Sequence, residues 1–214
     1  MTAYEYTTFR IERGGWPALR DGVGDIDTAS RELGGAVYLL CSGMIGLASD
    51  EGILIRTGSD DGPNGDGSAA SIVTGSVFQD WGSERLSPTV RPLDATPPRE
   101  PGVYAHRWFW LKPEHLDEFL QLSEHGIWPY FEADGCEIIG LWRGDDDGSL
   151  RRLLLITRYP SVAHWERTRL QSPVVPPGAD AQLYRQAQDA GRSRAAITEK
   201  SIVRLTRIVL PPAA

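Results

Sequence analysis

One order of predicted elements occurs twice along this chain of 214 residues. In the second half, apolar patterning predicts a strand, a helix and two further strands at 103–111, 114–133, 136–142 and 151–159. In the first half, strands are predicted at 4–11, 36–41 and 52–57, with a weaker helix over 18–33. Two β-α-β-β units in one chain imply two sheets that can face each other and enclose a cavity.

Each unit also has candidates for a second helix and a last strand. In the second unit, helices are expected at 161–169 and 180–196, before a closing strand at 200–210. In the first unit, the matching helix is expected at 68–82 and an edge strand at 89–94. The order β-α-β-β-α-β is the ferredoxin-like motif. The predicted fold class is therefore α+β, with two tandem ferredoxin-like units whose sheets pack as an α+β barrel.

The boundary between the units is expected in a proline-rich stretch. Residues 88–101 contain five prolines, which stiffen the chain and cannot donate to a sheet. We place the first unit at 1–94, a linker at 95–102 and the second unit at 103–214. Glycine, aspartate and serine dominate residues 59–71, which predicts a surface loop.

Charge is distributed unevenly between the two halves. Residues 1–101 carry 15 acidic and 8 basic side chains, whereas the remaining residues carry 14 of each. Nucleic acids and anionic membranes are bound chiefly through clustered lysine and arginine, so neither is an expected partner. The N-terminus lacks an apolar signal region and no apolar run is long enough to cross a bilayer, which predicts a cytoplasmic protein.

The cysteines and histidines give no metal pattern. Cys41 and Cys136 each fall in the predicted second strand of a unit, where they are expected to be buried and reduced. No histidine pair has ligand spacing and no glycine-rich turn resembles a phosphate site, so no metal and no cofactor is predicted. The three aspartates at 145–147 are expected to form a hairpin connection.

The segments 103–120, 135–142 and 155–169, in that order, resemble the NIPSNAP family. This family belongs to the dimeric α+β barrel group, and the resemblance extends faintly to residues 4–11. The family usually has Glu, Arg and Tyr at alternating positions of its first strand. The second unit has Ala105, Arg107 and Phe109 there, and the first unit has Glu5, Thr7 and Phe9. Related proteins include cofactor-free monooxygenases, cyclases, haem-handling proteins and scaffolds.

Alternate side chains of the strand 103–111 point to opposite faces of its sheet. A guanidinium is costly to bury beneath helices, so we expect Arg107 and Phe109 to point into the barrel cavity, away from the helices. By the same reasoning we expect Leu155, Thr157 and Tyr159 to point into the cavity from the neighbouring strand. Glu5, Thr7 and Phe9 are expected to do so from the equivalent strand of the first unit. Arg107 beneath a helix, or a barrel interior filled by bulky side chains, would end the proposal of catalysis in this barrel cavity. The opposite choice places an aromatic box of His106, Trp108 and Trp110 inside.

Three residues are candidates for catalysis. Arg107 has a permanently charged guanidinium that can orient a carboxylate or stabilise an enolate oxygen; the alternative is an ion pair with Glu5 or Glu137. Glu5 is a candidate general base if the cavity is dry. His125, expected near the end of the long helix, is a candidate proton shuttle or a cation favoured by the helix dipole. Candidate substrate-binding residues are Tyr159, Thr157, Phe109 and Trp142, the last as a roof over the cavity.

Two functions remain open from these residues. The first is a cofactor-independent enzyme that binds a small polyketide-like or aromatic acid and catalyses a cyclisation, isomerisation or oxygenation. The second is a non-catalytic scaffold that binds a hydrophobic ligand or haem; it would be marked by a cavity filled with side chains or by a single histidine in the cavity within reach of an iron. A homodimer is the expected assembly, because exposed edge strands often pair.

Overall fold

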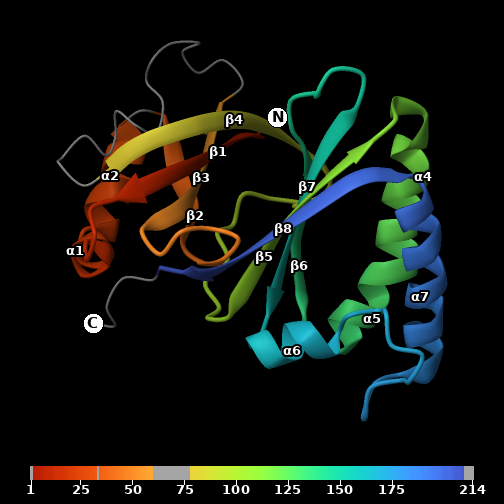
Figure 1. Ribbon diagram of the computed structural model, residues 1–214. Coiled ribbons are helices and arrows are strands. Elements are labelled where there is room, and N and C mark those ends of the chain that lie inside the picture. The colour runs from red at the N-terminus through yellow and green to blue at the C-terminus, as the bar shows by residue number, and fades with distance from the viewer. Residues whose placement is uncertain (1, 33, 60–77, 210–214) are drawn as a thin grey trace. The chain divides into compact units, whose positions relative to one another are not determined.

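The computed structural model describes residues 2–32, 34–59 and 78–209, which form two compact units (Figure 1). Neither unit is one continuous segment. Unit 1 comprises residues 1–88, 93–101 and 204–214, and unit 2 comprises residues 89–92 and 102–203. The long strands β4 (Phe78–Arg91) and β8 (Thr198–Ile208) therefore contribute residues to both units.

Unit 1 contains a sheet with the strand order β4-β1-β3-β2-β8, in which all neighbours are antiparallel. Its other strands are β1 (Thr2–Ile11), β2 (Gly35–Ile45) and β3 (Glu51–Ser59). Two short helices, α1 (Trp16–Asp21) and α2 (Val23–Glu32), replace the single predicted helix and are separated at Gly22. Leu19 and Ile26 of these helices pack with Phe9, Leu40 and Leu54 of the strands.

The predicted second helix of the first unit, 68–82, is wrong in its last part. Residues 78–82 are the beginning of β4, which pairs with β1 from Phe78 to Leu86. The rest of that predicted helix, 68–77, lies outside the described residues.

Unit 2 has the predicted order β-α-β-β-α-β. Its strands are β5 (Val103–Leu111), β6 (Glu137–Arg143), β7 (Arg151–Tyr159) and the first part of β8, and the end of β4 lies beside β6. Its helices are a 3₁₀ turn (Pro113–His115), α4 (Leu116–Gln121), a π-helical turn (Leu122–Ile127), α5 (Trp128–Ala133), α6 (Val162–Arg167) and α7 (Ala181–Ala196). The loop between β6 and β7 contains the three aspartates, as predicted.

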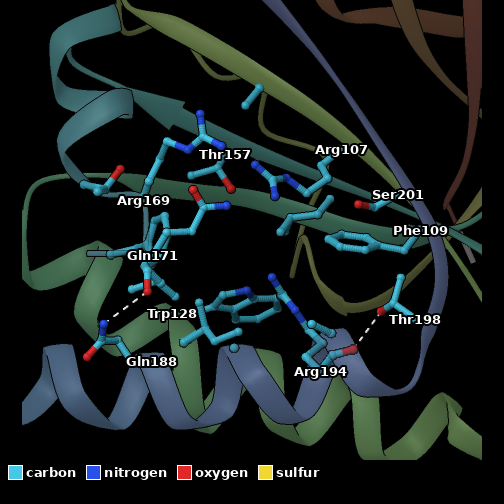
Figure 2. Close-up of a pocket in the computed structure, with 18 of the residues that line it drawn as sticks. Arg107, Phe109, Trp128, Thr157, Arg169, Gln171, Gln188, Arg194, Thr198 and Ser201 are labelled. Carbon is cyan, nitrogen blue, oxygen red and sulfur yellow. Dashed lines mark hydrogen bonds between the residues drawn. The ribbon is translucent and has the colours of Figure 1, made fainter. Parts of the chain in front are cut away.

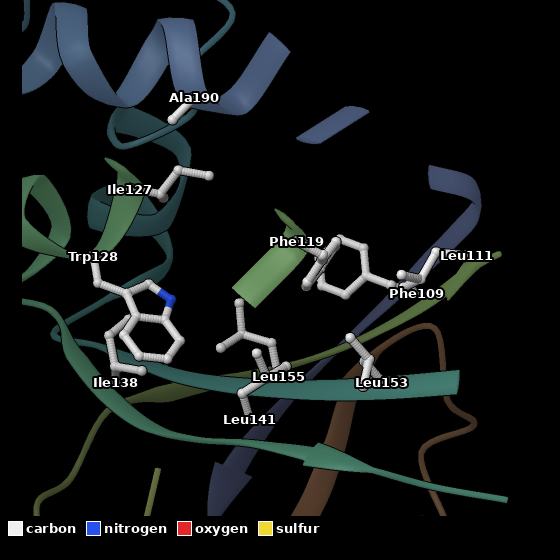
Figure 3. Close-up of a cluster of buried hydrophobic side chains, with 10 residues drawn as sticks. All are labelled: Phe109, Leu111, Phe119, Ile127, Trp128, Ile138, Leu141, Leu153, Leu155 and Ala190. Atoms are coloured by element: carbon white, nitrogen blue, oxygen red, sulfur yellow. The ribbon is translucent and has the colours of Figure 1, made fainter. Parts of the chain in front are cut away.

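The core of unit 2 lies between the sheet and helices α4, α5 and α7 (Figure 3). Alternate apolar residues of the strands supply one side and the helices supply the other. Phe119 of α4 is fully buried, and its ring meets the ring of Phe109 at 4.9 Å in an edge-on contact. The cluster comprises Phe109, Leu111, Phe119, Ile127, Trp128, Ile138, Leu141, Leu153, Leu155 and Ala190.

Helix α7 lies close against the π-helical turn. A Cβ on Gly126 would come within 2.3 Å of the Ala190 Cβ, so only glycine permits this approach. The extra residue of the π turn shifts the helical register just before Pro129, whose ring is accommodated in the first turn of α5. Asp180 caps α7 by accepting hydrogen bonds from the backbone N–H groups of Gln182 and Leu183, at 2.8 and 2.9 Å.

Both cysteines are buried free thiols, as predicted, and burial raises the pKa of each to about 12. Within the described ranges, no helix is both long and apolar enough to span a bilayer.

Candidate small-molecule pocket of unit 2

A pocket of about 870 Å³ lies in unit 2 between the sheet and its helices (Figure 2). Strands β5 and β7 form one wall, and helices α5 and α7 with the loop after α6 form the others. The side chains that concern the chemistry are Arg107, Phe109, Trp128, Thr157, Tyr159, Arg169, Gln171, Gln188, Arg194 and Glu199.

The register of β5 and β7 places the strand side chains together. Ala105 is paired with Thr157, and Arg107 is paired with Leu155. Paired residues of antiparallel strands point to the same face, so these four side chains lie next to one another on the pocket wall. The short side chain of Ala105 leaves room in front of Thr157 and Tyr159.

Helix α7 faces the pocket with residues three and four positions apart. Gln188, Gly191, Arg194 and Ala195 follow the helical period and lie on one face. The Gln188 side-chain amide donates to the carbonyl oxygens of Leu170 and Ser172, at 3.1 and 2.6 Å, which holds the loop after α6 against the helix. Figure 2 shows Arg194 directed from α7 into the pocket, opposite Arg107 of β5.

The predicted orientation of Arg107 is wrong, and the proposal that Arg107 acts in the barrel cavity is withdrawn with it. Arg107 and Phe109 lie on the face of β5 that is covered by helices, and the alternating residues Tyr104, His106 and Trp108 are buried on the other face. The predicted orientation of Phe9 in unit 1 is wrong in the same way, because its side chain packs against α1 and α2. A guanidinium fits beneath the helices of unit 2 because the two layers do not close there and leave the pocket.

Two arginines in the pocket lack an acidic partner. Among the described residues, no carboxylate lies within ion-pair distance of Arg107 or Arg194. Burial lowers the pKa of Arg107, with a further decrease caused by Arg169 and an opposing effect of Tyr159. Burial and the neighbouring charge of Arg107 lower the pKa of Arg194 to about 9. Arg194 is held by a 3.1 Å hydrogen bond to Ser123 Oγ.

Aromatic rings support the Arg194 guanidinium. It lies 4.9 Å from the ring centroid of Phe109 and 5.2 Å from that of Phe119, which are cation–π distances. The other cations that line the pocket have partners: Arg169 pairs with Glu166 at 3.6 Å, Arg192 pairs with Asp189, and Lys200 lies over Trp110 at 4.5 Å. Arg107, Arg194 and Lys200 have no carboxylate partner among the described residues, but Lys200 is exposed to solvent, which screens its charge, whereas both arginines are half-buried.

Two hydrogen-bond donors accompany these charges. Burial raises the pKa of Tyr159, against the lowering effect of Arg107, so its phenol is protonated and can donate. The indole Nε1 of Trp128 is buried and finds no hydrogen-bond partner in the described part of the chain. A buried N–H without a partner is costly, and an oxygen atom of a bound molecule would satisfy it.

The pocket brings together four of the seven predicted site residues, Arg107, Phe109, Thr157 and Tyr159. Glu5 belongs to unit 1, where it accepts a 3.2 Å hydrogen bond from the buried Arg56. His125 lies in the π-helical turn with a largely exposed side chain, 3.9 Å from Glu124, rather than at a helix end. Trp142 is fully buried against Gly140 and does not line this pocket.

Sequence reasoning missed Trp128, Arg169, Gln188 and Arg194. A signal existed for Arg194, since Tyr184, Ala187, Ala190 and Gly191 precede it with the spacing of one helix face. A charged residue that continues an apolar face is a candidate for a buried functional group.

Histidines do not contribute to the pocket. All four lie within the described residues, and none of them lines it. His106 is buried on the opposite face of β5, and His164 pairs with Asp134 at 3.1 Å. The pocket therefore does not fit a haem held through an imidazole. In the described part of the chain, no three His, Cys, Asp or Glu side chains come together as a metal site would require.

Comparisons with known proteins show the fold. No protein-family model and no curated protein matches the chain. A solved anthrone oxidase-like protein is 14% identical over 100% of this chain and 97% of its own, with a TM-score of 0.61. A proposed monooxygenase from Fusobacterium nucleatum is 9% identical over 97% and 92%, with a TM-score of 0.57. A chlorite dismutase variant from Candidatus Nitrospira defluvii is 11% identical over 97% and 90%, with a TM-score of 0.58. These likenesses confirm the predicted ferredoxin-like α+β class.

Proposed function

We propose that unit 2 binds a small aromatic or polyketide-like acid and that the protein is a cofactor-independent enzyme acting on it. The observation that carries this proposal is the pair Arg107 and Arg194, which lack a carboxylate partner among the described residues and line one pocket. Half-buried cations such as these are stabilised by an opposite charge, and an anionic ligand would supply it. Phe109 and Trp128 offer apolar surface to a flat ring.

The chemistry that these residues support is the formation of an enolate or phenolate. A nearby cation lowers the pKa of an acidic group, because it stabilises the negative charge that appears when the proton leaves. One unit charge about 4 Å from another contributes about 4 kcal/mol at an effective dielectric constant of about 20. Arg107 would hold the developing oxyanion and the Tyr159 phenol would donate to it, while the proton leaves to solvent.

Oxygenation is the reaction that we favour among cyclisation, isomerisation and oxygenation. The names of two structural neighbours, an anthrone oxidase-like protein and a proposed monooxygenase, point to it. An anthrone is a flat tricyclic ketone whose enolate reacts with dioxygen. The overall conversion consumes one anthrone and one dioxygen and yields one anthraquinone and one water. We also propose that residues 103–169 are related to the NIPSNAP family and that the protein forms a homodimer.

A non-catalytic carrier of the same acid is the second candidate. This candidate is supported by the scarcity of groups in the pocket that could take a proton. Glu199 is the only carboxylate that lines the pocket in the described residues, and it lies 3.8 Å from Lys112. A carrier would bind aromatic acids without accelerating the loss of a proton from them.

Replacement of Arg107 by glutamine should lower the rate of oxidation of an anthrone carboxylic acid by about 100-fold, because loss of one oxyanion donor costs that much. Tyr159→Phe should lower it by about tenfold, the effect of one hydrogen bond. Anthraquinone absorbance under air measures both. Arg185→Gln is the matched control, since Arg185 is exposed on α7 and does not line the pocket.

Equal rates for Arg107→Gln and the unmodified protein would contradict the assigned site. Binding of aromatic acids without any acceleration would favour the carrier. An absence of both binding and acceleration would overturn the proposed function.

A further inference from the structure

The charges of the pocket do not balance. Arg192 pairs with Asp189 of α7, Arg169 pairs with Glu166 of α6, and Glu199 lies 3.8 Å from Lys112. Arg107, Arg194 and the exposed Lys200 have none among the described residues, so two half-buried positive charges remain on the wall beside a third that solvent screens. One bound negative charge would compensate only one of the two half-buried charges.

The two guanidinium groups lie on separate elements. Arg107 extends from the middle of β5, and Arg194 extends from the last turn of α7 (Figure 2). Arg194 is held by Ser123 and by the rings of Phe109 and Phe119, which keep its guanidinium on the side of the pocket formed by the helices. Each guanidinium therefore offers its own set of donors to the pocket.

The surroundings of the two arginines differ. Arg107 of β5 and Tyr159 of β7 extend from paired strands into the pocket, whereas Arg194 extends from α7. Arg107 with Tyr159 is thus suited to an oxygen that becomes negative during a reaction, since a phenol and a guanidinium both donate to it. Arg194 lacks that second donor and lies against two rings, which suits the carboxylate of an aromatic acid.

We propose that the pocket selects ligands that carry two anionic groups, a carboxylate at Arg194 and an enolate, phenolate or second carboxylate at Arg107. This inference rests on the proposed function and names its substrate class as an aromatic or polyketide-like acid with a second acidic oxygen. The unpaired Trp128 N–H would donate to an oxygen of the same ligand.

The test compares two probes of nearly the same shape, isophthalate with two charges and its monomethyl ester with one. Isothermal titration calorimetry at neutral pH should give an affinity for isophthalate about 10–100-fold higher than for the ester, the effect of one charged hydrogen-bonding group. Arg194→Gln and Arg107→Gln should each remove this preference, so that both probes bind with similar affinity. Arg185→Gln, on the exposed side of α7, should keep it.

The outcomes separate the two proposals. Equal affinities of the unmodified protein for diacid and monoester would overturn the selection of two charges and leave the acid-binding function standing. A preference for the diacid that persists in both arginine variants would also overturn it. Failure of both probes to bind the unmodified protein would overturn the acid-binding function and this inference together. Thermal melting of each variant confirms that the protein tested is folded.

Discussion

Replacement of Arg194 by methionine is expected to stabilise the ligand-free protein while weakening its affinity for isophthalate by at least about tenfold. Methionine keeps the apolar contact with Phe109 and Phe119 but removes a charge that burial and Arg107 disfavour. Relief of this kind is worth about 1–2 kcal/mol for a partly exposed group, a rise of about 2–8 °C in melting temperature.

The sign of this effect follows from the pKa of Arg194. Its value of about 9 in the folded protein lies well below the ordinary pKa of an arginine side chain, so the unfolded chain binds the proton more tightly. The free energy of unfolding therefore rises as the pH rises above about 9, because Arg194 then loses its proton in the folded protein. At neutral pH Arg194 is charged, and its full destabilising effect is present.

Urea titration measures the free energy of unfolding, and titration calorimetry measures the affinity for isophthalate, for the unmodified protein and for Arg194→Met. Arg185→Met removes an exposed arginine of the same helix and should change neither by more than about 0.5 kcal/mol. A less stable Arg194→Met protein would show that Arg194 is a structural residue. In Arg194→Met, the Ser123 hydroxyl would still donate its 2.7 Å hydrogen bond to the Phe119 carbonyl oxygen. The substitution therefore does not leave this buried hydroxyl without a hydrogen bond.

Phe119→Ala should lower the free energy of unfolding by about 3–5 kcal/mol, the range for a large ring removed from a core. Phe119 has 0% exposure and contacts both the ring of Phe109 and the guanidinium of Arg194. The cavity would open behind the pocket wall, so the affinity for aromatic acids should fall together with stability.

Equilibrium urea unfolding provides the measurement, and Leu93→Ala provides the control. Leu93 is 91% exposed, and its truncation should change the unfolding free energy by less than about 0.5 kcal/mol. A loss of less than about 1 kcal/mol for Phe119→Ala would mean that the layer between α4 and β5 does not form this core.

The sequence was sufficient for unit 2 because its patterns are strong and local. Alternating apolar residues at 103–111 and 151–159, and a helical period over 114–133, predict elements that the structure contains. Prediction was weaker for unit 1, where two glycines interrupt the helix over 18–33 and the chain divides it at Gly22.

Site prediction failed where it depended on contacts distant in sequence. The orientation of Arg107 was derived from the cost of burying a charge, and that cost disappears where helices and sheet leave a pocket. The partner of Glu5 is Arg56, 51 positions away, which no local pattern indicates. Arg194 was not predicted, although it continues the buried face of α7, because basic residues also surround it on the exposed faces.

A crystal structure with bound 4-bromophthalate would test the central claim directly, because the anomalous signal of bromine locates the ligand independently of its carboxylates. We predict one bromine peak in the pocket of unit 2, with carboxylate oxygens within hydrogen-bond distance of Arg107 and Arg194. A ligand bound away from both guanidinium groups, or a pocket that excludes the acid at saturating concentration, would contradict an anion site between this sheet and its helices.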